Sequence, residues 1–338
     1  MGVQTEIDRI ITAVGAAYDA VETKGGTAPA AQTIEGLAGA ISGIKSAPTT
    51  PYMEVEYVAV DSLSGTVHYI KRAKLYNHTA IYASEFSEQH QLQNLDFSDA
   101  SNNITVIEEL AFERAQVNGL VLPNTISALH RLCFNGAYIA TLVVPPLVTV
   151  LPESAFSYTK PVYNNETGEE LPVNIILPQN LTKIDIGCFE GAPIKQITIP
   201  DTVTEIGDRA FIYCEQLASI TLPLGIQKIS DRMLYGCISL TSITIPASVT
   251  EIGIQAFAYS GVTEITIPAS VTSIGDYAFA QNEDLYTVTC LAATPPTLGN
   301  GAFGPDPAGL TIKVPAASVA AYKAADGWKD YASYIVAM

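Results

Sequence analysis

Two segments of the chain, residues 243–257 and 265–279, read ITIPASVTEIGIQAF and ITIPASVTSIGDYAF. The alternation of isoleucine and threonine before each proline is typical of a short β-strand with one buried and one exposed face. Proline ends that strand because it has no N–H group for a further ladder bond. Ile252 then turns inward, Gly253 permits a tight bend, and Phe257 predicts a short helical turn packed inside the coil. Each segment therefore predicts one closed coil of chain.

The same two markers recur through most of the chain. One is the proline that ends each predicted strand, at intervals of 22, 33, 22, 23, 23 and 22 residues: Pro123, Pro145, Pro178, Pro200, Pro223, Pro246 and Pro268. The other is a large apolar residue, usually after alanine, which we call the landmark of its coil: Phe86, Phe112, Phe134, Phe156, Phe189, Phe211, Leu234, Phe257, Phe279 and Phe303. Two markers that keep one period predict an α/β repeat fold of about ten coils of 22–23 residues.

This pattern resembles the BspA-like (treponemal-type) leucine-rich repeat over about residues 81–315. The resemblance implies a right-handed solenoid that serves adhesion or recognition on bacterial and protozoan surfaces, without catalysis. A coil of this size cannot bury both its faces alone, so the two ends of the stack need caps. We expect residues 46–80 to form a linker and a capping hairpin, and residues 316–338 to form a C-terminal cap around Trp328.

Residues 1–45 predict a helical segment for attachment or oligomerisation. Their apolar residues fall at helical spacing, Gly25 and Gly26 end a first helix, and Pro29 can open a second. So short a segment closes little core, and its apolar stripes need cover from another copy, a partner or the first coil. The residues expected to mediate oligomerisation are Ile7, Ile11, Val14, Tyr18, Leu37 and Ile41. A simple helical cap is the alternative.

The sequence of residues 17–27, AYDAVETKGGT, is similar to helical segments of tail and fibre proteins from phages and prophages of Gram-positive bacteria. This resemblance implies that the segment joins a virion, a baseplate or further copies of the chain, as a homo-oligomer and possibly a trimer. It also fits the absence of a secretion signal from the given chain, because virion parts assemble in the cytoplasm and leave by lysis.

Composition excludes several functions. A formal net charge of −17 disfavours nucleic acid as a partner, and no apolar run is long enough to insert into a membrane. The five cysteines form no CxxC pair, which favours free thiols in apolar repeat positions over disulfides. The four histidines lack metal-ligand spacing, and no phosphate-binding glycine motif occurs. We therefore expect no cofactor, no metal and no catalytic residues.

The exposed middle positions of successive strands predict a binding surface. Five of them are threonines, which can simply stabilise a polar sheet, but Val121, Val143 and Ile176 form an apolar patch on the outer face. The 33-residue interval adds about 11 residues beside this patch, with a hairpin tip in its middle. The loop residues expected to face a ligand are Tyr163, Asn164, Asn165 and Glu166. An idle surface loop is the alternative.

Two functions follow from these expectations. The first is a receptor-binding or tail-fibre component of a phage or phage-like particle, located in the virion or outside the cell, that recognises a host-surface protein or glycan. The alternative is a secreted or cell-surface adhesin of the BspA-like type that binds protein or glycan on the bacterial surface. A repeat-bearing enzyme has no supporting residues.

Overall fold

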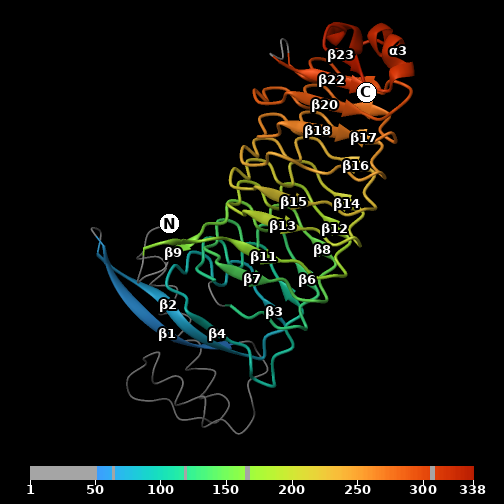
Figure 1. Cartoon of the computed structure of the whole chain (residues 1–338). Helices are drawn as coiled ribbons and strands as arrows, with labels where there is room; N and C mark the ends of the chain where they lie inside the picture. Colours follow the sequence, from blue (N-terminus) through green and yellow to red (C-terminus); the bar gives the residue numbers. More distant parts are fainter. Residues whose placement is uncertain (1–51, 63–64, 118–119, 164–167, 305–308) are drawn as a thin grey trace, which may run out of the picture.

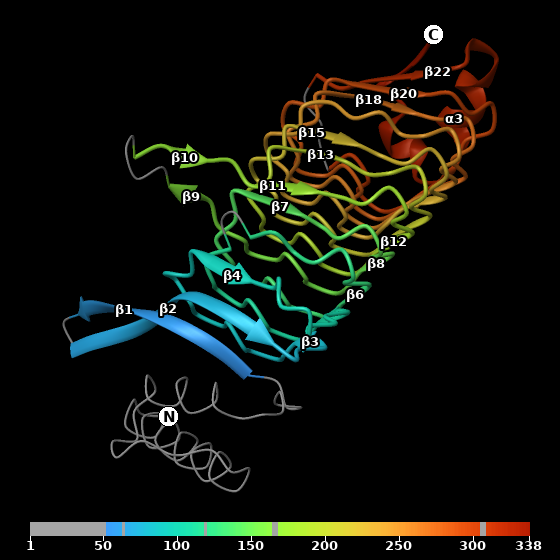
Figure 2. The same cartoon turned by 90° about the horizontal axis from the view of Figure 1, so that it is seen from below.

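The computed structural model describes residues 52–62, 65–117, 120–163, 168–304 and 309–338 (Figure 1). In both views the described chain winds as stacked coils from the β1–β2 end to the C-terminal cap (Figures 1 and 2). The two helices expected before residue 45, with Ile7, Ile11, Val14, Tyr18, Leu37 and Ile41, lie outside the described residues. Their role in oligomerisation stays a prediction.

The first outer face of the solenoid carries the strands that the Ile-Thr alternation predicts. Neighbouring strands pair in parallel, for example Ile197 with Ile220, and in both of these strands a buried middle residue lies between two exposed ones. Residues 241–246 keep this alternation but form no regular strand. The strands of this first face are β4 (Asn94–Asp96), β7 (Thr141–Val143), β11 (Asn174–Ile176), β13 (Gln196–Thr198), β15 (Ser219–Thr221), β18 (Glu264–Ile267), β20 (Thr287–Cys290) and β22 (Thr311–Val314).

A second parallel ladder closes each coil on another face. Its strands have two residues each, and the second residue of each is buried except for the partly exposed Leu298 of β21. Sequence analysis placed Ile252 inward but did not predict that its segment pairs with the neighbouring coils. These strands are β3 (Ala80–Ile81), β5 (Val106–Ile107), β6 (Ala128–Leu129), β8 (Val150–Leu151), β12 (Lys183–Ile184), β14 (Glu205–Ile206), β16 (Lys228–Ile229), β17 (Glu251–Ile252), β19 (Ser273–Ile274) and β21 (Thr297–Leu298).

The landmark turns correct one expectation. The predicted short helical turn is instead a pair of tight turns, with left-handed backbone two residues before and two residues after the landmark. Around Phe211 these residues are Arg209 and Tyr213, each with φ of 57°. The N–H of Phe211 donates to the carbonyl of Met233 in the next coil at 3.0 Å, so the turn bonds sideways rather than along a helix. Among the described residues, helices occur only in the C-terminal cap, and the repeat is built from strands and turns rather than α/β units.

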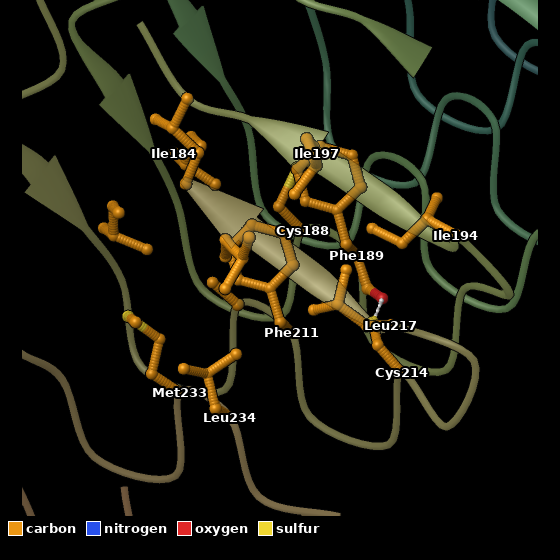
Figure 3. Close-up of a cluster of buried hydrophobic side chains, with 14 of the residues drawn as sticks. Ile184, Cys188, Phe189, Ile194, Ile197, Phe211, Cys214, Leu217, Met233 and Leu234 are labelled. Atoms are coloured by element: carbon orange, nitrogen blue, oxygen red, sulfur yellow. Dashed lines mark hydrogen bonds between the residues drawn. The ribbon is translucent and has the colours of Figure 1, made fainter. Parts of the chain in front are cut away.

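The core is a column of landmark side chains that runs along the solenoid. Phe86 to Phe211 stack face to face in six successive coils, with ring centroids 5.1–5.5 Å apart and planes within 12°. Leu234 interrupts the column, and Met233 fills the neighbouring space, where other coils have alanine or cysteine (Figure 3). Offset aromatic stacking adds to the burial of apolar area, so the column supplies much of the cohesion between coils.

Both ends of the described stack carry caps. At the N-terminal end, β1 (Tyr52–Ser62) and β2 (Gly65–Tyr76) form an antiparallel hairpin, and β2 pairs in parallel with β4. This hairpin matches the alternation that runs from Met53 to Leu75. At the other end, η1 (Ala316–Ser318), α3 (Val319–Ala324), η2 (Trp328–Tyr331) and β23 (Ile335–Ala337) cover the last coil.

The C-terminal cap completes the hydrogen bonds of the last coils with side chains. The indole N–H of Trp328 donates to the carbonyl of Pro296 at 2.7 Å, and the Tyr322 hydroxyl donates to that of Ala292 at 2.9 Å. The hydroxyl of Tyr331 accepts from the N–H of Phe303 at 3.3 Å. Trp328 is fully buried, as expected of a cap residue rather than a ligand anchor.

Candidate binding surface

The structure exposes the apolar residues that sequence analysis singled out on the first face. The exposed fractions are 81% for Val121, 54% for Val143 and 44% for Ile176. Val143 and Ile176 lie directly opposite each other in the parallel pairing of β7 and β11, and Val121 holds the equivalent place one coil earlier. Side chains of paired residues are close enough to touch across a ladder, so Val143 and Ile176 form one apolar surface.

The extra residues of the long coil form a hairpin beside this surface. Its strands, β9 (Val162–Tyr163) and β10 (Glu170–Leu171), pair antiparallel, and both views show them projecting outward near β7 and β11 (Figures 1 and 2). Val162 is buried at the base, whereas Tyr163 is 57% exposed. Asn164, Asn165 and Glu166 lie outside the described residues, so their contact with a ligand stays a prediction.

The rest of the first face changes to polar side chains. Thr198 faces Thr221, and Thr266 faces Thr289, in the register of their strand pairs. Stacked threonines satisfy a polar sheet surface by cross-strand contacts. Apart from Val336 of the cap strand β23, which is 43% exposed, the exposed large apolar residues of these strands lie in the coils near the hairpin.

The second face is a ladder of charges. Lys183 pairs with Glu205 at 2.9 Å, and Lys228 pairs with Glu251 at 2.8 Å, each across neighbouring strands. The carboxylate of Glu205 raises the pKa of the Lys183 ammonium group. Such exposed pairs contribute little stability each, about 0–1 kcal/mol. The apolar side chain of Val150, next to Lys183 in the ladder, is 40% exposed on the same face.

Aspartates of the landmark turns hold neighbouring coils together. Asp208 accepts a hydrogen bond from the N–H of Asp231 at 3.1 Å, and Asp231 accepts one from the N–H of Ile254 at 3.0 Å. These carboxylates cap backbone groups of the next coil, as aspartates in turns commonly do. A shallow hollow of about 390 Å³ lies among them, with Ile186 and Arg232 at its rim.

His78 is buried in a pair that the sequence did not reveal. Its Nε2 lies 2.9 Å from a carboxylate oxygen of Glu85, and its Nδ1 lies 2.9 Å from the carbonyl oxygen of Tyr76. Burial disfavours the charged ring, but the hydrogen bonds to Glu85 and Tyr76 outweigh that effect and raise the pKa of His78. Because both ring nitrogens face acceptors, the protonated imidazolium satisfies this site best. Seven residues separate the pair, and no motif marks it.

The five cysteines are free and buried, as the repeat positions predict. Burial raises the pKa of the Cys237 and Cys290 thiols to about 12, which keeps them protonated. Cys214 donates a hydrogen bond to the carbonyl of Phe189 at 3.0 Å (Figure 3). Its role is to satisfy a buried backbone group rather than to react.

The described part of the chain offers no group of three or more histidine, cysteine or acidic residues placed to hold a metal ion. Within the same residues, no helix is both long and apolar enough to span a membrane. His68 and His130 lie far from the buried pair of His78 and Glu85 along the chain, and His90 packs between the rings of Tyr69 and Tyr138.

Stacked coils with a phenylalanine column and two parallel ladders define a leucine-rich-repeat solenoid. More narrowly, the chain belongs to the family described as BspA type leucine rich repeat region, which matches residues 66–163 and 169–286 in 6 copies. No curated protein matches the chain.

Three solved structures are similar in fold. A leucine-rich repeat protein from Bacteroides ovatus is 20% identical, with a TM-score of 0.49 over 77% of this chain and 70% of its own. A leucine rich cell surface protein from Faecalibacterium prausnitzii is 16% identical, with a TM-score of 0.33 over 86% and 94%. The pneumococcal vaccine antigen PcpA is 13% identical, with a TM-score of 0.38 over 75% and 63%.

Proposed function

We propose that this chain is a non-catalytic binding protein of the adhesin type that recognises a protein or glycan at a cell surface. The observation that carries the proposal is an exposed apolar surface, Val121, Val143 and Ile176, beside a hairpin that interrupts an otherwise regular array. Apolar side chains on an outer sheet face favour a partner that covers them, and insertions in repeat arrays are frequent places of recognition.

Of the two functions that the sequence suggests, the cell-surface adhesin is now the better supported. It rests on the repeat family, to which the chain belongs. The phage tail-fibre function rests on residues 1–45, which lie outside the described residues. Genomic neighbours distinguish the two: tail and lysis genes favour the particle, and an upstream signal peptide or wall anchor favours the adhesin.

The test replaces the apolar surface with the side chain that other coils carry. In the variant Val121→Thr, Val143→Thr and Ile176→Thr, the threonine ladder continues without interruption. We expect the fold to be retained, because exposed substitutions change the free energy of unfolding by about 0.5 kcal/mol or less each. The matched control, Thr221→Val, replaces one hydroxyl group with a methyl group elsewhere on the same ladder.

Labelled full-length chain is added to washed bacterial cells and to cultured epithelial cells, and bound fluorescence is measured by cytometry. We expect binding of the unmodified chain and the control to at least one cell type, and loss of binding at least tenfold for the triple variant. Deletion of residues 161–171 tests the hairpin in the same way. Absence of binding to both cell types, or equal binding by the triple variant and the control, would overturn the proposal.

A further inference from the structure

A second exposed feature runs along the landmark turns. In each landmark turn from Phe86 to Phe279, the residue two positions after the landmark has left-handed backbone, and in six successive coils it alternates between glycine and tyrosine. These residues are Gly136, Tyr158, Gly191, Tyr213, Gly236 and Tyr259. We call Tyr158, Tyr213 and Tyr259 the tyrosine row; their exposed fractions are 51%, 47% and 46%.

Each of the first two rings covers the glycine of the following coil from outside. A methyl group placed on Gly191 would lie 2.7 Å from Cδ1 of Tyr158, and one on Gly236 would lie 2.7 Å from Cδ1 of Tyr213. The rings therefore lie across the surface and span two coils each. Tyr235 fills the space between Tyr213 and Tyr259, with ring centroids 5.4 and 5.1 Å from theirs.

Packing alone does not require aromatic rings in this row. Left-handed backbone is unfavourable for bulky residues and favours glycine or asparagine. Shielding of a glycine is also achieved without an aromatic ring, because the aliphatic stem of Arg114 covers Gly136, with its Cγ 3.1 Å from the place of a methyl group. What packing leaves unexplained is the recurrence of tyrosine at one position in every second coil.

The spacing of the row indicates the kind of ligand. Neighbouring coils are separated by about 4.8 Å, the distance between paired strands, so alternate coils place the rings about 10 Å apart. This distance is close to the length of one disaccharide unit in an extended β-1,4-linked glycan, whose sugar rings present CH faces that stack on aromatic rings. An exposed row of aromatic rings with hydroxyl groups suits such a chain better than it suits a compact ligand, which needs a concave pocket.

The charge of the protein narrows the class of glycan further. The Tyr158 hydroxyl donates a hydrogen bond to the Glu190 carboxylate at the edge of the row. The whole chain carries a net charge of −17. Acidic polysaccharides are repelled by this field, whereas neutral ones are not. We propose that the tyrosine row binds a neutral, extended β-1,4-linked glycan along the axis of the solenoid.

The chain provides a closely matched control. Tyr277 also has left-handed backbone, is 49% exposed and covers a glycine, Gly301, with its Cε1 2.8 Å from the place of a methyl group. It lies two residues before its landmark rather than after it, and so outside the row. The row variant is Tyr158→Asn, Tyr213→Asn and Tyr259→Asn, and the control is Tyr277→Asn. Asparagine tolerates left-handed backbone, so both variants are expected to fold.

Calorimetry of the full chain with chitohexaose, cellohexaose and the α-1,4-linked maltohexaose tests the proposal. We expect the unmodified chain and the control to bind at least one β-1,4 hexamer, more tightly than its dimer and more tightly than maltohexaose. The row variant should lose at least tenfold in affinity. Lack of binding to both β-1,4 hexamers, or equal affinity of row variant and control, would refute it.

This inference does not rest on the proposed cell-surface role of the first face. The chain that lacks residues 161–171 should bind the hexamer as the unmodified chain does. Loss of glycan binding in that deletion, with retention in the row variant, would assign the glycan to the hairpin and overturn the role of the tyrosine row. Failure of cell binding with intact hexamer binding would overturn the proposed function alone.

Discussion

The interruption of the phenylalanine column gives the sharpest test of the packing. Met233 and Leu234 are both fully buried and extend into the core next to Phe211 (Figure 3). Where other coils have alanine and phenylalanine, this coil has methionine and leucine, and each pair carries the same number of side-chain heavy atoms. We infer that the two residues compensate each other, and that restoring the repeat pattern requires both to change together.

The expected magnitudes follow from the local geometry. Leu234→Phe alone overpacks the coil, because Met233 occupies the space, and should cost about 1–3 kcal/mol of unfolding free energy. Met233→Ala alone leaves a cavity and should cost about 2–5 kcal/mol. In the double variant, the new ring stacks between Phe211 and Phe257 and can gain about 0.5–1.5 kcal/mol per aromatic pair. The double variant should therefore lie within about 1 kcal/mol of the unmodified protein.

Urea titrations followed by circular dichroism on the four proteins give the coupling energy of the cycle. We expect the double variant to lose at least about 2 kcal/mol less unfolding free energy than the sum of the losses of the two single variants. The change Leu142→Ala, in the same core but three coils earlier, serves as a control and should simply add to Leu234→Phe. Additive losses in the double variant would refute the idea of a compensated pair.

Three further predictions concern other features of the structure. Because the pKa of His78 is raised in the folded chain, its contribution to stability is fully present below the ordinary histidine pKa of about 6.5 and is lost as the pH rises through the folded pKa. The free energy of unfolding should therefore fall over that pH range in the unmodified chain but not in His78→Gln. Urea titrations at several pH values measure this difference. All five thiols should react with Ellman's reagent only on unfolding, because they are buried and protonated; reaction of the native chain at the rate of a small thiol would contradict this. Gly207→Ala should destabilise the chain by about 1 kcal/mol or more, since its methyl group would lie 2.7 Å from the backbone nitrogen of Ile186, whereas Gly225→Ala, in open space, should change the thermal midpoint little.

The period of the sequence was sufficient to predict the solenoid, the buried landmarks and the burial of Trp328. It was sufficient because side chains that recur every 22–23 residues must stack, and stacked apolar side chains form a column. The exposure of Val121, Val143 and Ile176 follows from strand alternation in the same way.

The conformation of the landmark turns could not be predicted in this way. Alanine, which precedes most landmarks, has the highest helix propensity. In the structure, residues such as Gln255 and Tyr259 instead have left-handed backbone and donate sideways hydrogen bonds to the next coil. The pair of His78 with Glu85 depends on the path of the chain in the first coil. The alternation of glycine and tyrosine becomes visible only after the positions relative to each landmark are aligned in space.

The side-chain hydrogen bonds of the C-terminal cap have a consequence for assembly. In each of the preceding coils, the landmark N–H donates a hydrogen bond to a carbonyl of the next coil. Without the cap, the landmark N–H of the last coil would be free to bond to a second molecule. Tyr331 occupies the N–H of Phe303 instead, and its ring and that of Trp328 cover the phenylalanine. The cap thus closes the C-terminal end of the solenoid, and a chain cut before residue 316 is expected to associate with a second copy through the opened end.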